Sequence, residues 1–216
     1  MWNENRSNQT VLDRAIGQGV WQESPLVGVD ALLKKHEATA SKAFRLNERP
    51  FLELVNVRGD LRDAAFVAAV ESVIGCKPPE KANTTATGNG YDLMWLGPDE
   101  WLVRSAAAHS ATQTAPMEAR LREAVKGLYA AAVDIGSGYT VLEISGTRTR
   151  EVLVRGCPLD LHPTLFGEGQ CAQTHYFKAS MTLLPTGADS FDIVVRRSFA
   201  DYFVKIMLDA AEPLMS

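Results

Sequence analysis

The alternation of apolar and polar residues becomes regular at residue 51, where it predicts a strand followed by a helix. Phe51-Leu-Glu-Leu-Val-Asn-Val57 is rich in β-forming residues and ends just before Gly59. From Asp60, an N-cap residue type, apolar side chains recur every three or four positions until Gly75, which predicts a helix. Its apolar face comprises Phe66, Val70, Val73 and Ile74.

Similar patterns predict further elements up to the C-terminus. Two apolar runs at 92–104 flank Gly97-Pro98-Asp99, which predicts a hairpin with its turn there. Ser198 and Asp201 have the spacing of a capping box at the start of the last helix. We expect helices over 114–127, 146–155 and 198–211, strands over 130–135, 139–144, 174–184 and 191–195, and a loop over 84–90.

The two halves of the chain repeat one order of elements. Leu52-Glu-Leu, followed later by Gly75-Cys76, recurs as Leu142-Glu-Ile, followed later by Gly156-Cys157. Each half reads strand, helix, strand, strand, helix, and one more strand follows the first half. This order suits a split βαβ, or ferredoxin-like, unit with helices on one face of an antiparallel sheet. The predicted fold is therefore α+β, with tandem repeats at 50–135 and 136–216.

Residues 1–49 precede these repeats and are polar and weakly patterned. We predict an extended N-terminal arm with at most a short helix near 29–37. The arm contains Trp2 and Trp21, and an aromatic residue in a segment without its own core often packs against a partner. We therefore expect the arm to form an interface.

Composition narrows the classes of function. The 216 residues are 46% hydrophobic and 22% charged, with a net charge of −4, as in an ordinary soluble domain. This charge gives no basic footprint for nucleic acid, and no apolar run approaches the roughly 20 residues that span a bilayer. Three cysteines and no signal-peptide pattern favour a cytoplasmic protein without nucleic-acid or membrane partners.

The stretch 156–175 contains Cys157, His162, Cys171 and His175, and could be a zinc site, a thiol active site or a turn. Zinc sites pair their cysteines at short spacing, which is absent here. A nucleophilic thiol needs a lowered pKa, but Cys157 follows the end of a predicted helix, where the helix dipole disfavours a thiolate. The pattern favours a helix cap and turn, and we predict no catalytic and no metal-binding residue.

The sequence contains no catalytic motif elsewhere, but it contains a cluster of arginines in the second half. Gly136-Ser-Gly138 precedes a predicted strand, so we interpret it as a hairpin turn and not as a phosphate loop. The arginines could hold anionic groups, anchor an interface with another chain, or lie on a solvated face. These candidate interface residues are Arg148, Arg150, Arg155, Arg196 and Arg197.

Four separated motifs occur in an order that resembles a known family, the gamma subunits of heterotetrameric sarcosine oxidase. They are Leu96-Gly-Pro-Asp-Glu-Trp-Leu102, Arg155-Gly-Cys-Pro-Leu-Asp-Leu-His162, Cys171-Ala-Gln-Thr174 and Val195-Arg-Arg-Ser-Phe-Ala200. The likeness extends over about residues 90–211. It implies a fold related to the folate-binding domain of glycine-cleavage aminomethyltransferases, in agreement with the tandem repeat.

The resemblance also implies an assembly that oxidises sarcosine to glycine with release of peroxide. The one-carbon unit passes to tetrahydrofolate, giving methylene-tetrahydrofolate, or leaves as formaldehyde. The alpha and beta subunits are expected to hold NAD, FAD, FMN and the folate site, and the delta subunit to hold zinc. The gamma subunit is the one without an assigned cofactor, so we expect this chain to bind none.

Two hypotheses follow for the chain. In the first, it is a non-catalytic, structural subunit that contacts the alpha, beta and delta subunits, and is inactive alone. In the second, it is a stand-alone folate-binding protein with a pocket between the repeats. A buried carboxylate, Asp134 or Asp160, would then hold the pterin, and the arginines would meet the glutamate tail.

Overall fold

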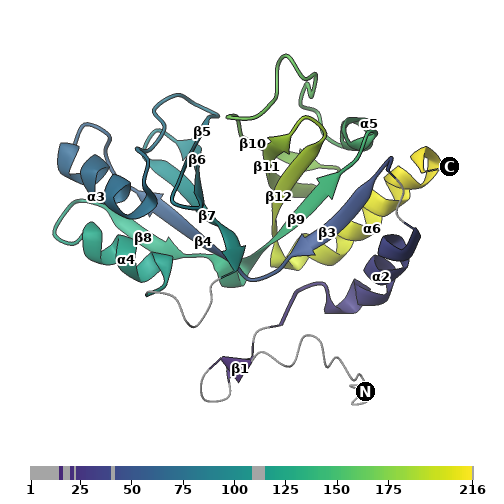
Figure 1. The fold of residues 1–216 in the computed structure, drawn as a ribbon, viewed down its shortest axis with the longest axis horizontal. Coiled ribbons are helices and arrows are strands. Elements are labelled where there is room, and N and C mark those ends of the chain that lie inside the picture. Colours follow the sequence, from purple (N-terminus) through teal and green to yellow (C-terminus); the bar gives the residue numbers. More distant parts are fainter. Residues whose placement is uncertain (1–14, 17–19, 22, 40–41, 109–114, 216) are drawn as a thin grey trace.

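The computed structural model describes residues 15–16, 20–21, 23–39, 42–108 and 115–215. Two five-stranded antiparallel sheets dominate the molecule, and helices cover the outer face of each (Figure 1). A short ribbon of β1 (Ala15–Ile16) and β2 (Val20–Trp21) lies apart from both sheets. The α+β class predicted from the sequence is confirmed. Among the described residues, no helix is both long enough and apolar enough to span a membrane.

The first unit has the strand order of a ferredoxin-like fold, with one additional edge strand. Its sheet has the order β5-β6-β7-β4-β8, and α3 and α4 pack on one face. The helices are α3 (Ala64–Ile74) and α4 (Met117–Ala124), and the strands are β4 (Leu52–Arg58), β5 (Thr85–Gly88), β6 (Tyr91–Gly97), β7 (Glu100–Ala108) and β8 (Ala131–Asp134).

Local signals explain how α3 begins and ends. The Asp63 carboxylate accepts a hydrogen bond from the Ala65 amide at 2.9 Å, so the N-cap is Asp63 and not Asp60 as the sequence predicted. Asp60 instead accepts hydrogen bonds from Arg62. At the other end Gly75 adopts a φ of 83°, the left-handed conformation that favours glycine after a helix.

The second unit repeats this architecture. Its sheet has the order β10-β11-β12-β9-β3. The strands are β3 (Arg45–Arg49), β9 (Tyr139–Ser145), β10 (Ala172–Tyr176), β11 (Ala179–Gly187) and β12 (Ser190–Arg196). The helices are α2 (Asp30–Thr39), α5 (Thr149–Val154) and α6 (Ala200–Ala211), with single 3-10 turns at η1 (Val27–Val29), η2 (Gly136–Gly138), η3 (Arg197–Phe199) and η4 (Glu212–Leu214).

The segment before residue 50 supplies part of this second unit, which corrects the prediction of a separate arm over 1–49. β3 pairs antiparallel with β9, with Leu46 opposite Ile144, and takes the place that β8 has beside β4. Phe44 and Leu46 are buried in the second core together with residues of α5 and α6. No described residue after α6 forms a strand, and β3 takes that edge position in the sheet.

Four further local predictions were wrong. The predicted loop over 84–90 contains the strand β5 and its turn to β6. The predicted strand over 174–184 is a hairpin, in which β10 and β11 join through a turn at Phe177–Lys178 that contains no glycine, asparagine or proline. The turn η2 joins strands of different sheets, so it is not part of a hairpin. No side chain caps the start of α6, so the predicted Ser198–Asp201 capping box does not form.

The two sheets meet through their inner faces. On β4, Leu54 points to this interface, whereas its neighbours Val55 and Val57 point to the α3 and α4 side. The interface core comprises Leu52, Leu54, Met94, Leu102, Val141, Cys171, Leu184 and Val194. An isolated bridge between Thr84 and Gln170 also ties loop segments of the two units together. The layers of the molecule therefore follow in the order helices, first sheet, second sheet, helices.

Candidate functional site

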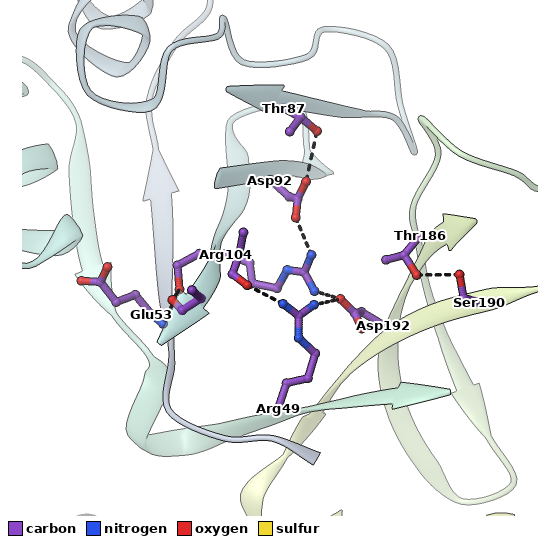
Figure 2. A network of polar contacts seen from close by, with 11 residues as sticks. Arg49, Glu53, Thr87, Asp92, Arg104, Thr186, Ser190 and Asp192 are labelled. Atoms are coloured by element: carbon purple, nitrogen blue, oxygen red, sulfur yellow. Dashed lines mark hydrogen bonds and ion pairs between the residues drawn. The ribbon is translucent and has the colours of Figure 1, made fainter. Parts of the chain in front are cut away.

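The most unusual chemistry of the described residues is an ionic network buried between the sheets (Figure 2). Arg104 on β7 forms ion pairs with Asp92 on β6 and with Asp192 on β12 of the other sheet. Arg49, at the end of β3, approaches Asp192 at 2.6 Å and donates to the Ala106 carbonyl. The network therefore connects both units through residues of four strands.

The centre of the network is deeply buried, and its charges balance. The side chains of Arg104 and Asp192 are only 4% and 1% exposed, and two arginines face two aspartates. Burial lowers the pKa of the Arg104 guanidinium, and the hydrogen bond to Asp92 opposes this shift. Within the described residues, Nε of Arg104 and Oδ1 of Asp192 are buried without hydrogen-bond partners. Such an arrangement costs desolvation, so each ion needs its counter-charge.

The geometry of the network favours a structural role over acid–base catalysis. The Asp92 carboxylate accepts hydrogen bonds from Arg104 and, at 3.0 Å, from the Thr87 hydroxyl. Asp192 is held between two guanidinium groups. Both carboxylates thus pair with guanidinium groups of the chain itself, as in ion pairs that fix packing. The network can fix the orientation of one sheet relative to the other.

The cysteines and histidines of the stretch 156–175 do not converge. The Cys171 thiol lies 3.5 Å from the carbonyl oxygens of Thr84 and Trp95, and burial raises its pKa to about 11. The Cys157 sulfur lies 3.7 Å from the Thr174 hydroxyl, whereas the His162 ring contacts Thr164 in its own turn. In the described parts of the chain, no three His, Cys, Asp or Glu side chains form a group that could hold a metal ion.

The two carboxylates considered for a pterin site are both exposed. Asp134 accepts a hydrogen bond from the Gly136 amide at 2.8 Å, and Asp160 accepts one from the His162 amide at 2.9 Å. Each carboxylate thus stabilises a local turn. A cavity of about 560 Å³ does lie beside Asp134, and it is lined by residues that include Arg49, Leu54 and Tyr139. Asp134 lines this cavity from the exposed end of β8, and Asp160 is exposed as well, so neither is the buried carboxylate that the folate-binding hypothesis requires.

Among the candidate interface arginines, Arg150 makes the most contacts within the chain. Its guanidinium donates to the carbonyls of Leu161, Phe166 and Ala188, and it stacks over the Phe191 ring at 4.9 Å. These carbonyls belong to the long loop before β10 and to the β11–β12 turn. Arg150 is therefore an internal anchor for two loops.

We expect Arg150→Ala to lower the free energy of unfolding by about 2 kcal/mol, because hydrogen bonds to a charged donor are lost together. Arg155→Ala is the matched control, since no hydrogen bond or ion pair joins Arg155 to another described side chain. It should change the unfolding free energy by no more than about 0.5 kcal/mol. Urea denaturation of both variants tests this, and equal small losses would contradict the anchoring role.

The other candidate interface residues divide into paired and unpaired groups. Arg148, just before α5, forms an ion pair at 2.5 Å with Glu151 in that helix. Arg155, Arg196 and Arg197 are exposed and form no ion pair with any described residue. Arg196 and Arg197 line a cavity of about 770 Å³ that adjoins the one beside Asp134. Trp21 lies in β2, and Trp2 lies outside the described residues.

Arg104 and Asp192 were not predicted from the sequence, although each leaves a signal there. Arg104 follows Trp101-Leu-Val103 within a strand, and Asp192 interrupts the apolar run of Phe191 and Ile193. A charge on a strand's inner face signals a partner when that face is buried. The sequence does not show that both faces of each sheet are covered. From the sequence, an aspartate in β12 is therefore equally compatible with a side chain that faces solvent.

Comparison with known proteins places the chain in one family. The model of the sarcosine oxidase, gamma subunit family matches residues 58–212. The chain is 29% identical to the sarcosine oxidase subunit gamma of Corynebacterium sp. (strain P-1), over 83% of this chain and 86% of that protein. It is 27% identical to the same subunit of Corynebacterium sp. (strain U-96), over 94% and 95% of the two chains.

Solved structures agree with these matches. A chain of the heterotetrameric sarcosine oxidase from Corynebacterium sp. U-96, in complex with pyrrole 2-carboxylate, is similar with a TM-score of 0.80 and 26% identity, covering 90% of this chain and 97% of that one. The glycine cleavage system aminomethyltransferase T from Bartonella henselae has a TM-score of 0.59 and 17% identity, covering 82% of this chain and 48% of that one. The second likeness concerns the fold alone, and it agrees with the expected relation to that fold.

Proposed function

The chain belongs to the sarcosine oxidase gamma subunit family, and we propose that it is the gamma subunit of a heterotetrameric enzyme that oxidatively demethylates sarcosine to glycine. The observation that carries the proposal is the agreement, over nearly the whole chain, with one chain of a heterotetrameric sarcosine oxidase. In this assembly, oxygen is reduced to peroxide, and the one-carbon unit leaves as formaldehyde or as methylene-tetrahydrofolate.

Within this proposal, the chain has a structural role beside catalytic partners. The alpha and beta subunits hold FAD, FMN, NAD and tetrahydrofolate, and the delta subunit holds zinc. Two properties of the described residues support this division of roles between the chain and its catalytic partners. The ionic network neutralises its own charges between the sheets, and the Cys171 thiol is protonated near neutral pH because its pKa is about 11. Such a chain supplies a rigid surface against which a catalytic subunit can exclude water.

Affinity isolation of the tagged chain from its native cells tests this proposal. We expect a yellow eluate with two larger chains and one small one, which oxidises sarcosine and releases peroxide. Removal of this chain by dissociation should lower the thermal stability of the remaining subunits. A colourless eluate with only this chain, or a complex that does not oxidise sarcosine, would contradict the proposal.

The alternative of a stand-alone folate-binding protein has less support, because Asp134 and Asp160 are exposed and hold local turns. Titration of the isolated chain with tetrahydrofolate separates the two functions. We expect no saturable binding in the micromolar range. Saturable micromolar binding that is lost in Asp134→Asn would instead support the folate-binding alternative.

A further inference from the structure

The hairpin turn between β10 and β11 has an unusual composition. Tyr176 pairs with Ala179, so the two turn residues are Phe177 and Lys178. Phe177 has a φ of 47°, in the left-handed region that large side chains rarely adopt. Two-residue hairpin turns that need a positive φ strongly prefer glycine, asparagine or aspartate there. A phenylalanine at this position therefore requires an explanation other than turn formation.

The first unit contains the equivalent turn and so provides an internal comparison. Between β5 and β6, Gly88 pairs with Tyr91, and the turn residues are Asn89 and Gly90, with φ values of 48° and 79°. The Asn89 side chain lies over Gly75, which ends α3: a Cβ on that glycine would be 2.6 Å from it. The fold thus forms this turn with the most favourable residue pair, Asn-Gly.

In the second unit the phenylalanine occupies the same place. A Cβ on Gly156, just after α5, would lie 2.5 Å from the Phe177 ring, and the Phe177 amide donates to the Gly156 carbonyl at 2.9 Å. The ring also contacts Tyr176 edge-on at 5.0 Å. Asparagine fills the equivalent position in the first unit, so the turn does not require the larger phenylalanine ring.

The additional side-chain area faces solvent. Phe177 is 41% exposed, and Val154, the last residue of α5, is 55% exposed. Both values are high for large apolar side chains, and Val154 lies two residues before the glycine that the Phe177 ring covers. This surface is therefore an apolar contact point that no described segment covers.

The rim of this surface carries positive charge. Arg155, between Val154 and Gly156, and Lys178, beside Phe177, are exposed and have no ion-pair partner among the described residues. The neighbouring carboxylate, Glu151, is already paired with Arg148. His175 is also exposed, and its ring nitrogen lies 3.0 Å from the Phe177 carbonyl oxygen, where Nδ1–H can donate and steady the turn. An apolar centre with unpaired cations around it complements an apolar pocket edged by carboxylates.

We propose that Val154, Arg155, Phe177 and Lys178 form a docking knob that inserts into an apolar, carboxylate-rimmed pocket of a partner subunit in the oxidase assembly. This inference rests on the proposed function, because it takes the partner to be a different chain of that assembly. Phe177 is the anchor, since buried aromatic side chains dominate the free energy of such contacts. Arg155 and Lys178 select the partner and its orientation.

Competitive assembly in cells tests the docking knob on the intact complex. Wild-type and variant chains with different tags are co-expressed with the partner subunits, and their ratio in the isolated oxidase is measured by mass spectrometry. The key variant is Phe177→Asn, because asparagine is the residue of the equivalent turn and suits the positive φ. Its melting temperature should equal or exceed that of the wild type, so a loss of assembly cannot be attributed to misfolding.

We expect Phe177→Asn to be depleted about 30-fold in the assembly, as for the loss of a central anchor. The double variant Arg155→Glu/Lys178→Glu should be depleted about 10-fold, and more strongly at low salt than at high salt. Tyr129→Ser is the matched control. Tyr129 is a fully exposed aromatic residue that precedes β8 of the first unit, and this variant should assemble like the wild type.

Failure of this inference can be told apart from failure of the proposed function. If wild-type chain enters no sarcosine-oxidising assembly, the proposed function is wrong and the inference falls with it. If the wild type assembles and Phe177→Asn competes equally, only the docking knob is wrong. Loss of a homodimer in Phe177→Asn, with unchanged entry into the oxidase, would identify a second copy as the occupant and also overturn the proposal.

Discussion

Asp192→Ala is expected to lower the free energy of unfolding by about 3–5 kcal/mol, the usual cost of removing one partner from a buried ion pair. The substitution would leave Arg104 with only Asp92 and would remove the carboxylate contact of Arg49. Because the Arg104 side chain is 4% exposed, water cannot replace the lost counter-charge. Urea denaturation followed by tryptophan fluorescence measures the loss.

A matched control tests whether the loss of stability depends on the burial of the ion pair and not on ion pairing alone. Arg58 and Asp99 form an ion pair at 2.7 Å, nearly the distance of the Arg49–Asp192 pair, but their side chains are 49% and 58% exposed. Asp99→Ala should leave the unfolding midpoint almost unchanged, since exposed pairs contribute little. If Asp192→Ala were as mild as this control, the network would not be holding the sheets together.

Phe44→Ala is the second substitution for which we expect a loss of about 3–5 kcal/mol, the range for truncating a fully buried phenylalanine. Phe44 is 0% exposed and lies just before β3, in the core shared with α5 and α6. The His36 ring lies 6.0 Å away, and its Nε2 accepts a hydrogen bond from the Leu46 amide. The truncation should therefore loosen both α2 and the edge strand β3.

This result would distinguish an integral segment from the separate arm that the sequence predicted. Removal of a side chain from an arm that orders only on a partner would cost the isolated chain almost nothing. Phe199→Ala provides the comparison. Because Phe199 is 40% exposed, its truncation should lower the free energy of unfolding much less. Hydrogen exchange of the β3 amides offers a second measurement, since strand amides paired within a sheet exchange slowly.

Much of the fold follows from local pattern. The predicted hairpin at 92–104 is present as β6 and β7, and the predicted helix that ends at Gly75 is present as α3. In each case the apolar spacing, turn residues and caps lie within a few residues of one another and agree. The repeated order of elements also predicted two α+β units, and both sheets are antiparallel as expected.

The errors arise where distant segments determine the local structure. Phe177 and Lys178 form a turn without a turn signal, because the pairing of the edge strand β10 with β11 sets the bend. The Ser198–Asp201 spacing gives no cap, because the backbone enters α6 through a 3-10 turn. β3 looked like part of a polar arm, since its strand pairing is with residues almost one hundred positions later.

The sequence by itself determined the α+β class, the internal repeat and, through four ordered motifs, the family. These depend on short-range periodicity and on residue identity, which a chain displays directly. Only the tertiary structure decided that β3 completes the second sheet, and that Arg104 and Asp192 meet between the sheets. It also decided which arginines are engaged within the chain, as Arg150 is, and which face outward, as Arg155 does. The physical reason is that charge pairing, burial and strand order depend on distances between segments far apart in the chain, and side-chain pattern does not encode those distances.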